Sequence, residues 1–286
     1  MATAIGGLAA EEAFGARKDF IRQDKIALMP ELNRDGKSRF SDRVDDYRKY
    51  RPHYQKDVIQ ALHQACGLRP DHVVADIGCG TGLSSEIFLQ NGNPVIGVEP
   101  NRKMREAGEQ FLAGYENFRM VEGSAEHTSL PSASVDIAFA GQAFHWFKVD
   151  ATKAEFARIL KPGGWVVLMW HDRDLESTPF LRAYEAFLRR HGIDYEQVAH
   201  RWVASYEVLH SFFAPAEMKQ IRLRNQQKLD FEGLRGRLMS SSYMPRSGER
   251  AEVMLKDLPN LFEAHAEDGH VLMQYDTNIY YGHFPA

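Results

Sequence analysis

Three glycines between two periodic segments are the residues best placed to bind a ligand. Gly78, Gly80 and Gly82 follow the apolar run Val73–Ile77, and a helical pattern opens directly after them. Glycine allows positive φ and close approach of the backbone to a ligand, and the N-terminus of a following helix favours an anionic group. The segment therefore predicts a ligand-binding turn between a strand and a helix, with a tight turn that binds nothing as the alternative.

Two acidic residues narrow the choice of ligand. Asp76 stands just before the turn, and Glu99 ends the next apolar run, Pro94–Glu99. A carboxylate at the first place suits a cation such as an ammonium and would repel a pyrophosphate. A carboxylate at the second place accepts hydrogen bonds from both ribose hydroxyls. The dinucleotide pattern G-x-G-x-x-G also needs glycine where Leu83 stands, so a nicotinamide-dependent oxidoreductase is the second hypothesis. S-adenosylmethionine (SAM) carries an ammonium, a carboxylate and a ribose, and fits best.

Five motifs in order resemble those of the class I SAM-dependent methyltransferases. They are Asp76–Gly82, Val98–Pro100 with Met104, Glu122–Glu126, Ser134–Ala138 and Arg158–Gly164. The resemblance is strong over Tyr47–Trp170 and implies SAM as cofactor. The residues it implies for cofactor binding are Tyr47, Arg51, Asp76, Gly78, Cys79, Gly80, Gly82, Glu99, Pro100, Met104, Ser124, Ala125, Glu126 and Gln142.

Some of these residues also have plainer interpretations. Pro100 and Met104 could serve packing, since methionine fills irregular gaps. Cys79 could be only a small residue in the turn, and Glu126 a solvated charge. Arg51 could anchor a carboxylate of cofactor or substrate through its bidentate fork, or form a surface salt bridge.

Two further segments resemble a small-molecule subgroup of that family, which includes methyltransferase-11 and trans-aconitate methyltransferase-like proteins. They are Tyr47–Tyr54 and Ala143–Phe147. This resemblance implies a small organic acceptor, with carboxylic acids among the candidates. The residues after the fourth strand, Gly141–Phe144, lack the N-P-P-Y type tetrapeptide of amide and base methylases. A non-catalytic SAM-binding protein and SAM chemistry other than methyl transfer stay open.

His145 is the candidate catalytic residue. It follows the fourth strand, at the end where ligands bind in open α/β sheets, and could act as a general base. The alternative is a packed histidine that lines the pocket. The substrate-binding candidates are His145, Trp146, Trp170 and Tyr243. No histidine spacing typical of a metal site occurs, so no metal is predicted.

Strands alternate with helices from Val58 to Trp170, which predicts a doubly wound, Rossmann-like α/β sheet covered on both faces. The family resemblance implies seven strands, mostly parallel, with an antiparallel last strand at Val271–Tyr281. Residues 38–286 are expected to form the methyltransferase domain, with a helical insertion at 171–215 that builds the substrate pocket. Residues 1–37 are expected to be an N-terminal extension, either partly disordered or a lid.

Composition excludes several other classes of protein. The 286 residues include 35 Lys and Arg and 39 Asp and Glu, so the net charge of −4 weighs against a dedicated nucleic-acid binder. Two cysteines exclude a disulfide scaffold and favour a reducing, cytoplasmic location. The N-terminus lacks the basic region of a signal peptide, and no apolar stretch approaches the roughly 18 residues of a membrane span. We expect a small-molecule substrate and no nucleic-acid or membrane partner; the oligomeric state stays open.

Overall fold

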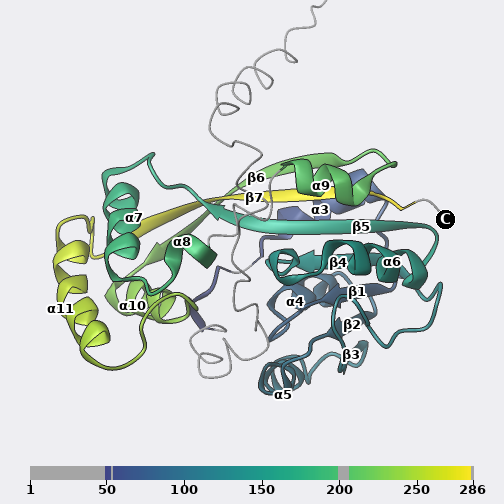
Figure 1. Ribbon diagram of the computed structural model, residues 1–286, viewed down its shortest axis with the longest axis horizontal. Coiled ribbons are helices and arrows are strands. Elements are labelled where there is room, and N and C mark those ends of the chain that lie inside the picture. The colour runs from purple at the N-terminus through teal and green to yellow at the C-terminus, as the bar shows by residue number, and fades with distance from the viewer. Residues whose placement is uncertain (1–48, 53, 199–205, 285–286) are drawn as a thin grey trace, which may run out of the picture. The chain divides into compact units, whose positions relative to one another are not determined.

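A mixed sheet of seven strands forms the centre of the computed structural model, which describes residues 49–52, 54–198 and 206–284 (Figure 1). The strand order is β3-β2-β1-β4-β5-β7-β6. Strands β1 to β5 run parallel, and β7 is antiparallel to both β5 and β6. The predicted α/β class, with an antiparallel last strand, is confirmed. The strands are β1 Val74–Ile77, β2 Val95–Val98, β3 Phe118–Val121, β4 Val135–Gly141, β5 Leu160–Arg173, β6 Lys219–Leu229 and β7 Val271–His283.

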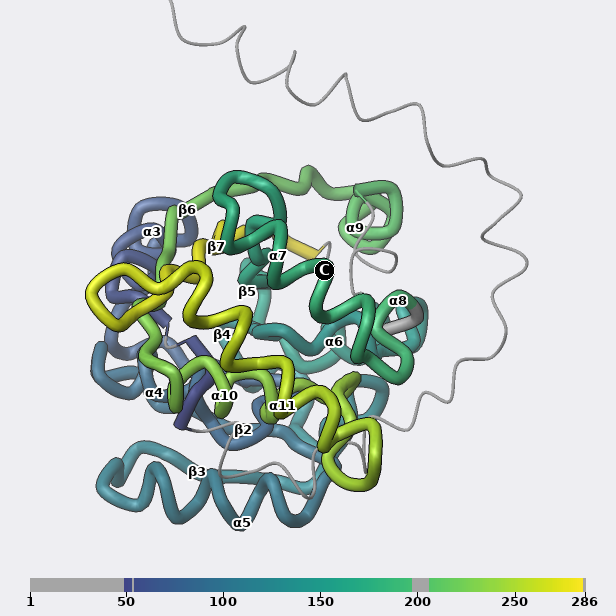
Figure 2. Tube along the Cα trace, turned by 90° about the vertical axis from the view of Figure 1, so that its left-hand side faces the viewer, coloured from purple at the N-terminus to yellow at the C-terminus, as the bar shows by residue number. Residues whose placement is uncertain are grey.

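Helices cover both faces of this sheet, as the apolar character of its central strands requires. Figure 2 shows α3 and α4 on one side of the sheet and α6 and α9 on the other. One core cluster joins α3 and α4 to the sheet, and a second joins α6 and α9 to the opposite face. The helices that flank the sheet are α3 Lys56–Cys66, α4 Leu83–Gln90, α5 Arg102–Phe111, α6 Val149–Ile159 and α9 Tyr206–Phe213.

The remaining helices pack together beyond the parallel part of the sheet, where β5, β6 and β7 are long (Figure 1). We call α7 Pro179–His191, α8 Tyr195–Val198, α10 Phe231–Met239 and α11 Glu249–Glu263 the helical cluster. A third apolar core joins these helices to β6 and β7. The sequence predicts a helical insertion at 171–215. The structure finds α7, α8 and α9 in that stretch and adds α10 and α11, which lie between β6 and β7 in the chain.

Several helix ends follow from single residues. The side chain of Asn101 accepts hydrogen bonds from the backbone N–H groups of Lys103 and Met104, which caps α5. Gly67 ends α3 with φ 61°, the left-handed conformation that glycine adopts at helix C-termini. Gly82 precedes α4 with φ 81°. No helix within the described ranges is both long and apolar enough to cross a bilayer.

Replacement of Gly82 by alanine tests the turn before α4. A Cβ there would lie 2.6 Å from Leu112 Cδ1, and the positive φ is strained for any L side chain. We expect Gly82→Ala to lower the free energy of unfolding by about 1–3 kcal/mol in urea denaturation. Gly114→Ala is the matched control, because nothing lies within 4 Å of its added Cβ. Equal stability of the two variants would contradict the strained turn.

Candidate active site

The glycine turn lies at the carboxyl end of β1 and contacts the ends of both neighbouring strands. Gly78, Gly80 and Gly82 have φ values of 70°, 57° and 81°, so all three adopt the left-handed conformation. The N–H of Gly78 donates to the carbonyl of Val98 at 2.8 Å. A Cβ on Gly78 would lie 2.8 Å from the Cβ of Ala143, the second residue after β4. The turn therefore lies between β2 and the segment after β4.

Asp76 lies beneath this turn with no solvent exposure. Its Oδ2 accepts hydrogen bonds from the hydroxyls of Ser84 and Ser85, at 2.6 and 2.7 Å. Its Oδ1 is buried and has no hydrogen-bond partner within the described part of the chain. Burial raises the pKa of this carboxyl to about 6, although the two serine hydroxyls act in the opposite direction. An unpartnered buried carboxylate oxygen fits a cationic donor such as an ammonium.

Sequence reasoning missed Ser84 and Ser85, although a local signal existed. They are the second and third residues of α4, directly after the glycine turn. A helix that starts at the end of a parallel strand returns along that strand, so its first turn faces the strand's last residues.

Glu99 follows β2 and is 8% exposed. Its Oε2 accepts a hydrogen bond from the N–H of Gly80 at 3.0 Å, and its Oε1 accepts one from the N–H of Asn101 at 2.8 Å. Each carboxylate oxygen can accept a second bond, so the group retains capacity for two ribose hydroxyls. Glu99 also ties the glycine turn to β2, a role that sequence reasoning did not assign to it. Burial raises the pKa of this carboxyl.

The other residues predicted to bind the cofactor surround this pair of acids. Met104 is buried, and its Cε would lie 3.3 Å from a Cβ on Gly80. Pro100 is half-buried after Glu99. Cys79 is buried, and burial raises the pKa of its thiol. Gln142 has φ 58°, and its N–H donates to the carbonyl of Met169 at 2.8 Å.

Ser124, Ala125 and Glu126 form the loop after β3, with Ala125 buried. Glu126 Oε1 accepts a hydrogen bond from the N–H of Lys148 at 2.8 Å, just before α6. Although burial acts to raise the pKa of this carboxyl, the hydrogen bond from Lys148 and one from Ser124 lower it. Glu126 therefore fixes the start of α6 and is more than a solvated charge.

The four residues predicted to contact substrate lie in three different places. His145 and Trp146 lie half-buried in η3, Phe144–Trp146, with their ring centroids 4.9 Å apart. Trp170 is 1% exposed and packs edge-on against Phe144 in the core. Tyr243 lies beside the helical cluster, 4.9 Å from the ring of Tyr195.

The segment before α3 connects the ends of several strands. The ring of Tyr54 packs on His171 at 4.6 Å, and its hydroxyl oxygen would lie 2.9 Å from a Cβ on Gly141 at the end of β4. Arg51 Nη2 donates to the carbonyl of Ser240 at 3.1 Å, and Gln55 donates to the side chain of Asn225 on β6 at 2.8 Å. Tyr47 lies outside the described residues. Sequence reasoning missed Tyr54 and His171, because their contact joins residues far apart in the chain.

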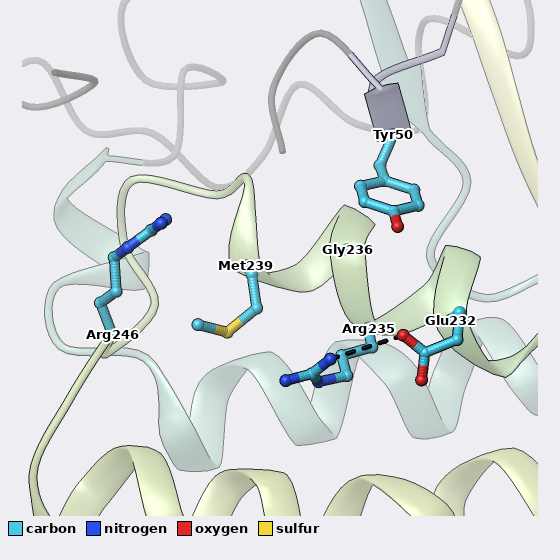
Figure 3. Close-up of a pocket in the computed structure, with 6 residues that line it drawn as sticks. All are labelled: Tyr50, Glu232, Arg235, Gly236, Met239 and Arg246. Atoms are coloured by element: carbon cyan, nitrogen blue, oxygen red, sulfur yellow. Dashed lines mark hydrogen bonds and ion pairs between the residues drawn. The ribbon is translucent and has the colours of Figure 1, made fainter. Parts of the chain in front are cut away.

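A cavity of about 290 Å³ opens between Tyr50 and one face of α10 (Figure 3). The ring of Tyr50 lies over Gly236. No side chain would fit at that position, since a Cβ on Gly236 would lie 2.1 Å from Cδ2 of the Tyr50 ring. Arg235 and Glu232 form an exposed ion pair at its rim. Neither Asp76, Glu99 nor any glycine of the turn before α4 lines this cavity. Its lining is Tyr50, Glu232, Arg235, Gly236, Met239 and Arg246. Over the same described ranges, no group of three or more His, Cys, Asp or Glu side chains is arranged to hold a metal.

The buried charge of Asp76 predicts how stability depends on pH. Because the folded-state pKa of this acid is raised from 3.8 to about 6, the folded state holds the proton more tightly, and stability is lost as pH rises from about 4 to 6. Asp76→Asn should remove that loss and make the ligand-free protein about 1–3 kcal/mol more stable than the wild type at pH 7.5. The free energy of unfolding in urea, at pH 4.5 and at pH 7.5, is the measurement.

Glu109→Gln is the control, because it also removes one negative charge, from an exposed position on α5. The stability of this variant should depend on pH as that of the wild type does. If Asp76→Asn also keeps the wild-type pH dependence, the buried carboxyl is not its source.

Known proteins are similar to this chain in sequence and in fold. A family model described as "Methyltransferase domain" matches residues 75–168. An uncharacterized methyltransferase of Mycobacterium bovis is 33% identical over 161 residues, which are 56% of this chain and 62% of that protein. The uncharacterized methyltransferase YcgJ of Bacillus subtilis is 32% identical over 136 residues, 46% of this chain and 53% of YcgJ. The chain therefore spans less than two thirds of the length of these curated relatives.

Solved structures agree in fold. The crystal structure of YcgJ superposes with a TM-score of 0.51 at 20% identity, over 81% of this chain and all of YcgJ. A proposed methyltransferase of Anabaena variabilis gives a TM-score of 0.56 at 22% identity, over 80% and 97% of the two chains. None of these names mentions trans-aconitate, so that subgroup stays a prediction. Residues 75–168 therefore match a methyltransferase domain, and the five sequence motifs and the sheet order resemble those of the class I SAM-dependent methyltransferases.

Proposed function

We propose that the chain transfers the methyl group of SAM to an oxygen, nitrogen or carbon nucleophile of a small organic molecule, with carboxylic acids as the leading acceptors. The observation that carries this proposal is the pair of acids at adjacent strand ends. Asp76 keeps a buried oxygen without a partner, and Glu99, held by Gly80 and Asn101, can accept further hydrogen bonds.

The residues present fit the cofactor. Asp76 Oδ1 would accept from the ammonium, Glu99 would accept from the ribose, and the glycine turn would bring the backbone close. When bound, SAM supplies a methyl group on a sulfonium. The sulfur leaves as a neutral thioether and needs no proton. The protein's task is then to align the acceptor with the methyl group, and such alignment can contribute about 7–11 kcal/mol.

His145 lies near the end of β4, where an acceptor would approach. As a general base it would take the proton of a hydroxyl acceptor, an effect typically worth about 10²–10⁴-fold in rate. A carboxylate acceptor has no proton to lose. If His145 is a base, its removal should therefore slow the reaction with hydroxyl acceptors more than with carboxylates. If it only lines the pocket, the effect should not depend on whether the acceptor carries a proton.

A relative's name supports oxygen as the acceptor atom. The malonyl-[acyl-carrier protein] O-methyltransferase of Serratia marcescens is 30% identical over 111 residues, 38% of this chain and 42% of that enzyme. The nicotinamide alternative is disfavoured, because the buried carboxylate of Asp76 would repel a pyrophosphate at the turn.

Titration calorimetry with S-adenosylhomocysteine (SAH), SAM and NAD tests the proposal. We expect SAM and SAH to bind the wild type and Glu109→Gln alike, and NAD to give no heat. Asp76→Ala should weaken SAM and SAH binding by about 100-fold, since charged hydrogen bonds contribute about 1.5–3 kcal/mol each. Binding of NAD without SAH would sink the assignment.

Methyl transfer from labelled SAM is then measured with a panel of carboxylic acids, alcohols and amines. His145→Ala should lower kcat by about 10²-fold or more with hydroxyl acceptors and little with carboxylates if the histidine is a base. Equal losses with both acceptors would leave it a pocket residue. SAH binding with no turnover of any acceptor would favour a non-catalytic SAM-binding protein.

A further inference from the structure

Arg237, on α10, is a buried cation without a buried anion beside it. It is 8% exposed. Its Nε reaches the hydroxyl of Tyr275 at 3.4 Å, and its Nη1 reaches the hydroxyl of Ser241 at 3.2 Å. Both partners are neutral, and no ion pair joins Arg237 to an Asp or Glu in the part of the chain that the structure describes. A buried charge that lacks a counter-ion costs several kcal/mol of stability.

The neighbouring buried arginine shows the ordinary arrangement. Arg173, at the end of β5, pairs with Glu185 on α7 at 2.6 Å and lies over the ring of Tyr184. Among the residues with a described structure, a carboxylate pairs with Arg173 and none pairs with Arg237, although both arginines lie close enough to Tyr184 to interact with it electrostatically.

The surroundings of Arg237 contain polar groups that suit an anion. The phenols of Tyr184, Tyr243 and Tyr275 lie close enough to interact electrostatically with the guanidinium. His171 is 6% exposed; its Nδ1 bonds to Thr277 Oγ1 at 2.8 Å, while its Nε2 is buried and has no partner. Burial, together with the charges of Arg237 and Arg51, lowers the pKa of His171 to about 4, although Asp172 acts to raise it. The imidazole is therefore neutral at pH 7 and adds no second positive charge beside Arg237.

This group of side chains is near the predicted cofactor site. His171 extends β5, which is two strands from β1 in the sheet. Adjacent strands are about 4.8 Å apart, so β5 lies about 10 Å from the strand that carries Asp76. Tyr54 lies between them, since it contacts His171 and lies beside Gly141 at the end of β4.

We propose that Arg237 binds an anionic group of the substrate, a carboxylate other than the group that is methylated. The proposal rests on the proposed function and makes Arg237 a specificity-determining residue. Its planar fork matches two oxygens of a carboxylate or of a phosphate. The substrate class is then a small molecule that carries an oxyanion in addition to its methyl acceptor.

Calorimetry on the SAH-loaded protein tests the proposal, with malonate, succinate, citrate and inorganic phosphate as probes. We expect at least one carboxylate to bind the wild type, and Arg237→Met to weaken it by about 10–100-fold, the usual range for a charged hydrogen-bonded contact. SAH affinity should stay within about twofold. Arg235→Met is the control, since Arg235 is exposed on the same helix and pairs with Glu232 (Figure 3). Tighter binding of phosphate than of any carboxylate would contradict a carboxylate as the group bound by Arg237 and would point to a phosphate group of the substrate.

Thermal unfolding of the ligand-free protein is an independent readout. Because Arg237→Met removes an uncompensated buried charge, its Tm should equal or exceed that of the wild type, whereas loss of a structural arginine would lower it. Probe affinity unchanged in Arg237→Met would overturn the proposal. So would a loss of SAH affinity, which would assign Arg237 to the cofactor, or a wild type that binds no probe.

Arg237→Lys covers the case in which the methionine variant does not fold. It keeps the charge and loses the fork, so carboxylate affinity should fall by about tenfold with SAH affinity unchanged. Equal carboxylate affinity would again contradict the proposal. Failure of the wild type to bind SAH would instead count against the proposed function, and titration of the probes without SAH would still report on Arg237.

Discussion

The side chain of Asp76 is removed from water at the carboxyl end of β1, where two serine hydroxyls bind one oxygen and the other oxygen has no partner. Leaving a charge in this state is costly, and burial raises the pKa of the carboxyl to about 6. The surrounding structure follows from holding that group in place. The glycine turn lies over it, α4 starts directly beyond and supplies the serines, and Glu99 ties the turn to β2 through Gly80.

The parallel strands bring the remaining site residues to the same edge. The strands β1, β2, β4 and β5 all end there, so the residue that follows each one faces a common space. Three residues before α3 then connect these ends to β6 and to the C-terminal end of α10, namely Tyr54, Gln55 and Arg51. The helical cluster is assembled from two stretches of chain, one before β6 and one after it, which share a single apolar core.

Asp76 and Arg237 are two buried charges of opposite sign that have no ion-pair partner among the described residues. Other partly buried charges do form ion pairs, as Glu155 with Arg158 and Glu185 with Arg173. A buried charge without a counter-ion is expected to lower the stability of the ligand-free protein. Proteins retain costs of this kind where a ligand supplies the missing charge. An ammonium at one end and an oxyanion at the other would complete the site electrostatically.

Local pattern in the sequence was enough to predict the α/β sheet and the glycine turn with Asp76 and Glu99, because apolar runs, glycines and strand-end acids act over a few residues. The antiparallel last strand was implied by the family resemblance. Local pattern was not enough for Tyr54 on His171 or for the isolation of Arg237. Arg237 meets Tyr275 across 38 residues and Tyr54 meets His171 across more than 100, and no local signal encodes such contacts. Whether a charged residue has a partner is decided by which elements pack together, and only the tertiary structure determines that.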